Sequence, residues 1–377
     1  MFEQHPNTSL NLDLAQFMAT HWQQKPALIR QLIPQFNDPI SAEELAGLAM
    51  EECVSSRIIS NGETQHGPFE TFETLSNDGA SLLVQAVNHW HPESAMLFDQ
   101  FRFIPNWRLD DLMVSYSTPQ GSVGAHLDQY DVIIIQGEGK RRWRVGKVLE
   151  QHAAEVFCHG DEFDAVIDVE MQPGDALYIP PNCPHQGTTL AHCLNYSVGF
   201  RAPSVSEMMT RLADQLIDTD SGKQRFSDTS RQATNTPGQL ISSDVAQLQT
   251  LLMNYIQSNE GRDLLISQLT EQERDLDLAV LTDEYTPNTL LEDLKQGAIF
   301  ERCAGLIPMY ESSNDHISLY IQGDVYNFNS HEEAWVQLLC DQHSIYLSES
   351  SELLPTVEFL TILSTLINQG YWYQAGA

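Results

Sequence analysis

The sequence predicts an α+β protein made of an antiparallel jelly-roll barrel, a helical region and a small C-terminal domain. Residues 111–203 contain alternating or fully apolar strands separated by glycine and proline turns, a pattern typical of jelly-roll barrels. From Ser204 onward, apolar residues recur at helical spacing instead. The chain of 377 residues is long enough for two or three domains. We expect a barrel domain with N-terminal helical elements over residues 1–203, a helical region over 204–298 and the C-terminal domain over 299–377.

Helical patterns occur on both sides of the predicted barrel. The expected elements are, in order, helices near residues 13–22 and 42–50, an apolar segment at 82–90, a helix carrying Met208, Leu212 and Leu216, a polar linker at 218–239 and a helix at 245–256. An apolar stripe on a helix is more often ordinary core than a contact between subunits, so the pattern alone does not decide what the region after the barrel does.

The C-terminal domain combines a hairpin with two helices. Gln322-Gly323-Asp324 separates apolar runs at 317–321 and 325–328, which indicates a tight β-hairpin. Helices near 332–339 and 356–368 flank it, a winged-helix pattern that is usually associated with DNA. The charged residues from position 299 onward are one basic residue, Arg302, and ten acidic residues, Glu301, Glu311, Asp315, Asp324, Glu332, Glu333, Asp341, Glu349, Glu352 and Glu358. Because phosphate binding needs a cationic surface, DNA binding by this domain is not expected.

The formal net charge of −33 argues against nucleic acid as a direct ligand and favours basic partners through electrostatic steering. A soluble acidic surface suited to a salty or cold environment explains the excess equally well. No basic flank followed by an apolar run begins the chain, and no apolar stretch is long enough to cross a bilayer, so we expect a cytoplasmic protein without a membrane partner. The six cysteines contain no Cys-x-x-Cys pair, which argues against a zinc site and for reduced thiols.

The segment from Gly121 to Asp131 carries the main chemical signal. Its residues His126 and Asp128 are two positions apart, and the apolar run Val132-Ile133-Ile134-Ile135 follows them. In a strand, residues two apart project from the same face, so an imidazole and a carboxylate would point at one spot. Two histidines and one carboxylate form the facial triad of non-haem Fe(II) oxygenases. The third ligand should therefore be a distant histidine.

A second His-x-Asp sequence, His159-Gly160-Asp161, shows that the tripeptide alone is a weak signal. It lies between Cys158 and the acidic stretch Asp161-Glu162-Phe163-Asp164, which predicts a solvated loop rather than a buried strand. We therefore assign the metal role to His126 and Asp128.

The third ligand is expected at His185. The turn Pro173-Gly174-Asp175 precedes a short buried strand at 176–179, and the proline-rich segment 180–184 then forms a stiff loop that ends at His185. A stiff loop at the end of a barrel strand holds a ligand in place before the metal binds. His192 is the nearest competitor, but it lies in a turn and is expected to be exposed.

These motifs closely resemble those of the bacterial ribosomal oxygenases, in the JmjC branch of the cupin superfamily. The resemblance rests on Gly-x-His-Leu-Asp-Gln-Tyr-Asp-Val from Gly124, Gly-Asp-x-Leu-Tyr-Ile-Pro-Pro before His185, Asn195-Tyr196-Ser197-Val198-Gly199-Phe200-Arg201-Ala202-Pro203, and Pro68-Phe69-Glu70 leading to residues 83–90. It covers nearly the whole chain. It implies a double-stranded β-helix, which is the cupin-like JmjC jelly roll, then a helical dimerisation region and a winged-helix-like domain, and hence a homodimer.

The resemblance also implies Fe(II), 2-oxoglutarate as cosubstrate and molecular oxygen. A guanidinium suits the distal carboxylate of 2-oxoglutarate because it stays charged and binds carboxylates bidentately. Lys140, Arg141, Arg142 and Arg144 are the candidates, and strand alternation places Arg142 and Arg144 on one face and Arg141 on the other. By match to the family motif, the inward residue is Arg141.

Ser115 and Asn195 match the polar positions that contact the cosubstrate in this family. A serine or asparagine within a predicted strand more often bonds to nearby backbone groups, so the residues alone leave both readings open.

The activity that the resemblance implies is hydroxylation of an arginyl side chain at its β-carbon (3-hydroxylation) in the large-subunit ribosomal protein L-sixteen, with 2-oxoglutarate converted to succinate and carbon dioxide. Tyr130, Asp110 and Asp111 are candidates to contact the guanidinium of that basic substrate. Two alternatives are a histidyl hydroxylase of another ribosomal protein, as in eukaryotic relatives, and a non-catalytic metal-binding cupin scaffold.

Overall fold

A computed structural model describes residues 10–271, 274, 276–279, 281, 283–313, 315–347 and 355–376. The chain divides into two compact units. The first comprises residues up to Ala202 with short additions that include Cys303–Gly305, and the second comprises most of the chain from Pro203 onward. The finer boundary between 204–298 and 299–377 stays a prediction.

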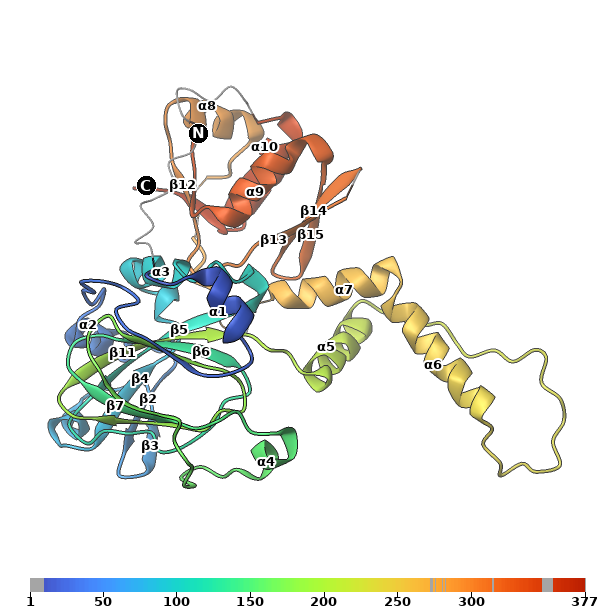
Figure 1. Cartoon of the computed structure of the whole chain (residues 1–377). Helices are drawn as coiled ribbons and strands as arrows, with labels where there is room; N and C mark the ends of the chain where they lie inside the picture. Colours follow the sequence, from blue (N-terminus) through green and yellow to red (C-terminus); the bar gives the residue numbers. More distant parts are fainter. Residues whose placement is uncertain are drawn as a thin grey trace. The chain divides into compact units, whose positions relative to one another are not determined.

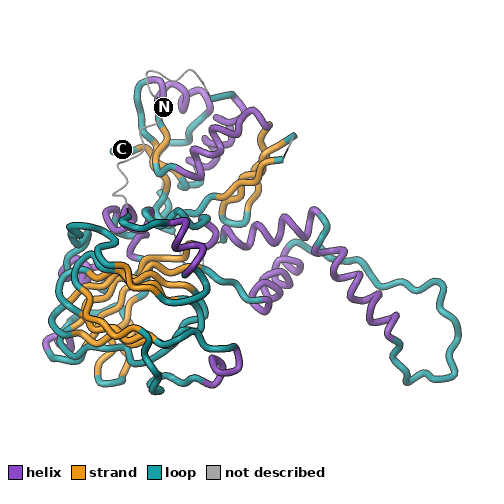
Figure 2. The backbone as a smooth tube through the Cα atoms, in the orientation of Figure 1, coloured by secondary structure: helices purple, strands orange, loops and turns teal. Residues whose placement is uncertain are grey.

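The first unit is mainly β-structure (Figures 1 and 2). Its strands are β1 (Ala27–Ile29), β2 (Ser56–Ser60), β3 (Glu63–His66), β4 (Ala80–Val84), β5 (Leu109–Ser117), β6 (Asp131–Gln136), β7 (Arg141–Val145), β8 (Ile167–Met171), β9 (Ala176–Ile179), β10 (His185–Thr189) and β11 (Cys193–Phe200). Its α-helices are α1 (Leu14–Thr20), α2 (Ala42–Leu48), α3 (Pro92–Asp99) and α4 (Gln151–Val156). The helices expected near 13–22 and 42–50 are thus confirmed as α1 and α2.

Two antiparallel sheets form the predicted jelly roll. The larger has the strand order β1-β9-β6-β11-β5-β4-β2-β3, and the smaller has the order β10-β7-β8. Their facing surfaces share one apolar cluster, in which Val132 and Ile134 of β6 pack with Trp143 and Val145 of β7 and Met171 of β8. Burying apolar surface between the sheets drives this pairing.

The opposite face of the larger sheet is covered by the N-terminal helical elements. Ile133 and Ile135 of β6 pack there in a cluster that includes Phe17 of α1, Leu45 of α2 and Phe98 of α3. Strand β6 is therefore buried on both faces, which explains its unbroken β-branched run. Its alternation assigns even-numbered positions to the barrel interior, where the candidate site lies.

The second unit contains the helices and the hairpin predicted after the barrel. Its elements are α5 (Val205–Asp218), α6 (Ser242–Ile256), α7 (Asn259–Thr270), α8 (Pro287–Lys295), β12 (Phe300–Arg302), β13 (Met309–Ser312), β14 (His316–Ile321), β15 (Asp324–Asn329), α9 (Glu333–Asp341), β16 (Ser344–Ile345), α10 (Val357–Asn368) and β17 (Trp372–Gln374). The hairpin β14–β15 turns at Gln322 and Gly323, whose φ angles of 48° and 85° are those of a tight two-residue turn.

The interior of the second unit is formed by the wing-like sheet and the last helices. Phe359 of α10 packs against Phe328 of β15 at 6.0 Å and against Trp335 of α9 at 5.4 Å between ring centroids. Helix α6, in contrast, has no buried residue. None of the helices in the described part of the chain is both long and apolar enough to cross a membrane.

Candidate active site

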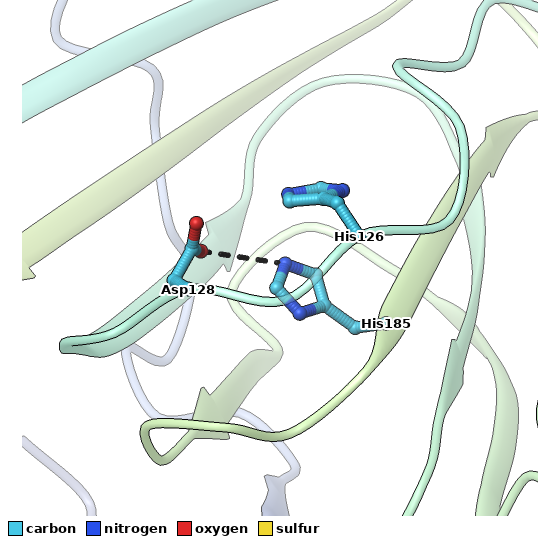
Figure 3. A group of neighbouring side chains, drawn as sticks. All are labelled: His126, Asp128 and His185. Atoms are coloured by element: carbon cyan, nitrogen blue, oxygen red, sulfur yellow. Dashed lines mark ion pairs between the residues drawn. The ribbon is translucent and has the colours of Figure 1, made fainter. Parts of the chain in front are cut away.

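His126, Asp128 and His185 come together inside the barrel (Figure 3). One ligand atom from each lies within 4.8 Å of the other two, and among the described residues this is the one group of three or more such side chains that could hold a metal ion. The Asp128 Oδ2 atom lies 3.6 Å from His185 Nε2. This grouping agrees with the expectation from the sequence, although His185 is distant in the chain from His126 and Asp128.

The local structure at His126 and Asp128 differs from the expected strand. His126 forms a single β-bridge with His185, and the regular strand β6 begins only at Asp131. The facing segment contains Pro181 and Pro184, which have no N–H to donate, so a continuous ladder cannot form there. The two candidate ligands therefore project from an extended segment held by isolated hydrogen bonds.

His185 also differs from its expected place in a loop, since it is the first residue of β10. Its backbone N–H donates to His126 O at 2.8 Å, and the His126 N–H donates to His185 O at 3.1 Å. Two residues further on, Asp128 O accepts a hydrogen bond from Asn182 N at 2.8 Å. These bonds fix the backbone of all three candidate ligands.

Both histidines are oriented through their Nδ1 atoms. His126 Nδ1 lies 3.1 Å from Gly124 O, and His185 Nδ1 lies 3.0 Å from Cys183 O. A carbonyl oxygen only accepts, so Nδ1 carries the proton in each ring and Nε2 keeps a free lone pair. Backbone carbonyls commonly orient metal-binding histidines in this way.

The protonation states suit metal binding. Burial, with smaller contributions from His126 and Arg141, lowers the pKa of His185 to about 3, so its imidazole is neutral at physiological pH. Burial raises the pKa of Asp128. His126 and a hydrogen bond from Tyr130 lower it, but by less. A neutral imidazole and a desolvated carboxylate are the forms that gain most from coordinating a cation.

The two rejected histidines lie outside this group. His192 is exposed, and its Nδ1 lies 2.7 Å from the hydroxyl oxygen of Tyr116. His159 is also exposed, but its ring stacks on that of His126 with 6.4 Å between centroids, and its Nε2 lies 2.6 Å from Val123 O. The second His-x-Asp sequence thus packs beside the candidate site without supplying a ligand atom to it.

Arg141 is buried near this group, with only 3% of its surface exposed. Its Nη1 donates to Asn195 Oδ1 at 3.2 Å and its Nη2 to Gly187 O at 3.4 Å, while its Nε has no partner among the described residues. No carboxylate of the described chain lies within ion-pair distance of it, and burial lowers its pKa. A buried cation without a counter-charge is costly, so this guanidinium is suited to an anionic ligand.

The neighbouring basic residues face away, as the alternation predicted. Arg142 is exposed and forms a bidentate pair with Asp168 at 2.7 and 2.8 Å. Arg144 stacks over the ring of Phe163 at 5.2 Å, and Lys140 is exposed.

Polar residues form a row across the inner face of the larger sheet beside Arg141. Asn195 of β11 pairs with Ser115 of β5 on one side and with Gln136 of β6 on the other. All three are buried, with 5% or less of their surface exposed. The predicted Ser115 and Asn195 thus lie side by side, but sequence reasoning missed Gln136. The signal for it was a polar residue ending an apolar run at an interior position.

Gly187 lets the Arg141 guanidinium pack closely against the backbone of β10. A Cβ atom at this position would lie 2.5 Å from Arg141 Nε and 2.9 Å from the ring of Trp143. The missing side chain therefore lets the guanidinium occupy this position. The unpaired donor and the missing counter-charge together fit a carboxylate.

The residues predicted to contact a basic substrate have different environments. Tyr130 is 45% exposed, and burial together with Asp128, Asp111 and Asp110 raises the pKa of its hydroxyl. Asp111 is buried, and its Oδ2 accepts from Ala86 N at 2.9 Å. Asp110 lies 3.5 Å from the Arg201 guanidinium. The carboxylates of Asp110 and Asp111 add negative charge near Tyr130 and Asp128.

Two segments of the chain match known protein families. Residues 96–208 match the JmjC domain family, and residues 257–373 match the ROXA-like winged helix family. The ribosomal protein uL16 3-hydroxylase of Escherichia coli is 38% identical over 375 residues, which is 97% of this chain and 99% of the relative. A probable ribosomal oxygenase of Haemophilus influenzae is 31% identical over 75% of each chain.

Solved structures agree with these relatives. The structure of YcfD, a ribosomal oxygenase from Escherichia coli, superimposes with a TM-score of 0.87 at 38% identity and covers 98% of this chain and 99% of its own. A structure of YcfD in complex with cobalt and 2-oxoglutarate gives the same TM-score. With its JmjC barrel, its winged-helix domain and a full-length relative at this identity, the chain belongs to the ribosomal oxygenase family.

Proposed function

We propose that the protein is an Fe(II)- and 2-oxoglutarate-dependent oxygenase that hydroxylates an arginyl residue of ribosomal protein uL16 at the β-carbon. The observation that carries this proposal is the pairing of a His-Asp-His group with a buried, uncompensated arginine inside one barrel. A scaffold that only held metal would need the first feature but not the second. The hydroxylase activity named for the full-length relative supports the enzyme.

The metal would be held by His126 and His185 through Nε2 and by Asp128 through its carboxylate. Two imidazoles and one carboxylate on one side of an ion leave positions open, and this donor set suits Fe(II). When bound, Fe(II) with 2-oxoglutarate and molecular oxygen supplies the chemistry that inserts oxygen into a C–H bond and leaves succinate and carbon dioxide. Backbone carbonyls orient both imidazoles, and burial keeps that of His185 neutral.

The cosubstrate would be bound at its distal carboxylate by Arg141. The Nε–H of this guanidinium has no partner among the described residues, and no described carboxylate lies within ion-pair distance of it; both observations support this assignment. Ser115 and Asn195, next to each other on the sheet, would complete the polar lining. Burial strengthens each of these charge-assisted hydrogen bonds because water does not compete for them.

The substrate would be a basic loop of uL16 whose arginine enters beside Tyr130. Asp111 and Asp110 add negative charge near this tyrosine, and the whole chain carries a net charge of −33. An arginine guanidinium is attracted to such a site, and the attraction should weaken as salt screens exposed charges beyond about 8 Å. Nucleic acid is not expected to bind directly.

The test is mass spectrometry of uL16 after incubation with the enzyme, Fe(II) and 2-oxoglutarate. A gain of one oxygen, mapped to the β-carbon of one arginine by fragmentation, is the expected result. Oxygen on a histidine would instead assign the protein to the histidyl hydroxylases. If no ribosomal protein gained oxygen and no succinate formed, the scaffold alternative would replace the enzyme.

The assembly that we propose is a cytoplasmic homodimer formed through the helical region 204–298. Helix α6 supports it, because Val245, Leu248 and Leu252 lie at helical spacing and are 38%, 47% and 61% exposed. A second copy would cover this apolar stripe. Light scattering should find a dimer for the native chain and a monomer for the double variant Leu248→Glu/Leu252→Glu. Thr250→Glu, on another face of α6, is the control and should stay dimeric.

A further inference from the structure

The amide group of Gln136 has a defined orientation inside the barrel. The residue ends β6 and is fully buried. Its Nε2 lies 3.4 Å from Gly137 O, 3.3 Å from Glu138 O and 3.2 Å from Leu194 O. Three carbonyl oxygens can only accept hydrogen bonds, so the group that faces them must be the NH₂. The carbonyl oxygen of Gln136 is therefore forced to point the other way.

This orientation is passed on to Asn195. Gln136 Oε1 accepts a hydrogen bond from Asn195 Nδ2 at 2.9 Å, so the NH₂ of the asparagine is fixed toward the glutamine. The Asn195 Oδ1 then faces Arg141 Nη1 at 3.2 Å, and the thiol of Cys193 also donates to it at 3.6 Å. If Asn195 were reversed, its NH₂ would face the guanidinium and no hydrogen bond would form.

We propose that Gln136 is a positioning residue for 2-oxoglutarate binding, which acts by holding Asn195 in the orientation that aligns the Arg141 guanidinium. The inference rests on the proposed function, because it concerns the residue assigned to the distal carboxylate. Asn195 and Gly187 take one donor from each Nη group, and the Nε of Arg141 has no partner in the part of the chain that the structure describes. The glutamine thus determines which donors the arginine presents to an incoming carboxylate.

The first experiment compares 2-oxoglutarate binding by the wild-type protein and by Gln136→Met, which keeps the length of the side chain and removes its amide. Isothermal titration of the Mn(II)-loaded proteins should give a dissociation constant about tenfold higher for the variant, the size of one lost hydrogen bond to a charged group. Metal content should be unchanged. The KM for 2-oxoglutarate should rise while kcat at saturating cosubstrate stays near the wild-type value.

A double-mutant cycle separates positioning from general loss of stability. If Gln136 acts through Asn195, the double variant Gln136→Met/Asn195→Ala should bind 2-oxoglutarate no more weakly than Asn195→Ala alone. Additive losses would overturn the inference. The matched control is Tyr196→Phe, which removes a buried hydrogen bond to Asp38 at 2.8 Å from the adjacent position of the same strand. An equal loss of affinity in this control would also overturn it.

One further measurement needs no variant. In wild-type protein with labelled asparagine, the side-chain amide of Asn195 should exchange its hydrogens slowly, because the glutamine and the barrel protect it. Exchange as fast as that of exposed asparagines would contradict the proposal, even if Gln136→Met failed to fold. If the wild-type protein bound no 2-oxoglutarate, the proposed function itself would fail. Equal binding by wild type and Gln136→Met would refute only the role of Gln136.

Discussion

His126 and His185 are joined directly through their main chains, with N···O distances of 2.8 and 3.1 Å in the two directions. Their rings lie 4.2 Å apart between centroids as a consequence of this pairing. A β-bridge fixes the separation of its two residues, so the spacing of the candidate ligands is a property of the backbone. The loops on either side can vary without moving one histidine relative to the other.

The carboxylate of the ligand group should be essential for metal binding. Replacing Asp128 with Ala removes the one negatively charged donor of the group and leaves only the two imidazoles. We expect the purified variant to lose most of its Fe(II), measured by elemental analysis, and to form no succinate. The control is Asp168→Ala, which removes an exposed carboxylate of the same barrel. Near-normal iron content in Asp128→Ala would refute the ligand assignment.

Only the inward-facing arginine of β7 should affect the cosubstrate. Arg141→Ala removes the buried guanidinium and should weaken 2-oxoglutarate binding by about 10- to 100-fold, as expected for charge-assisted hydrogen bonds worth about 1.5–3 kcal/mol. Iron binding should persist. Arg142→Ala removes an exposed arginine that pairs with Asp168, and should change little. If titrations showed weaker 2-oxoglutarate binding for Arg142→Ala and not for Arg141→Ala, the assignment of Arg141 to the cosubstrate would be wrong.

A single methyl group at position 187 should interfere with the same site. The Cβ of a Gly187→Ala variant would lie 2.5 Å from Arg141 Nε, closer than van der Waals contact allows, so the guanidinium must shift. We expect a higher KM for 2-oxoglutarate and an unchanged metal content. Gly47→Ala is a suitable control, because no atom lies within 4 Å of its added Cβ. An unchanged KM would show that the position of this guanidinium does not affect cosubstrate binding.

Asp175, in the turn before β9, should make stability depend on pH. Burial raises the pKa of this carboxyl, but hydrogen bonds from Gln172 N, Gln31 N and the Arg30 guanidinium outweigh it and lower the pKa below its ordinary value. The carboxylate therefore stabilises the folded state above the unfolded pKa, and this contribution disappears as the pH falls through the lower folded pKa.

The variant Asp175→Asn should accordingly lose about 1–3 kcal/mol of unfolding free energy at pH 7, measured by urea denaturation. The difference from wild type should narrow from about pH 5 downward. Asp168→Asn removes an exposed ion pair and should cost less than about 1 kcal/mol. A difference between Asp175→Asn and wild type that did not depend on pH would exclude the carboxylate as its cause.

Local patterns predicted most of the fold. The apolar run before Gln136, the stripe of Met208, Leu212 and Leu216, and the Gln322-Gly323-Asp324 turn each specify their own element, because strands, helices and hairpins depend on neighbours in the chain. The residue types at His126, Asp128 and His185 likewise pointed to a three-donor metal group. The alternation of β7 placed Arg141 opposite Arg142, and the burial of the two residues confirms this.

The rest of the fold and of the candidate site depends on how distant segments of the chain pair. The sequence by itself determined the sheet-forming runs, the helices after Ser204 and the chemistry of the three candidate ligands, since these depend on residue type and local spacing. Only the tertiary structure replaced the expected strand at His126 with a single bridge to His185, and only it aligned Gln136, Asn195 and Arg141 across two sheets. Cross-strand register sets those contacts, and register depends on which strands pair, which no local pattern contains.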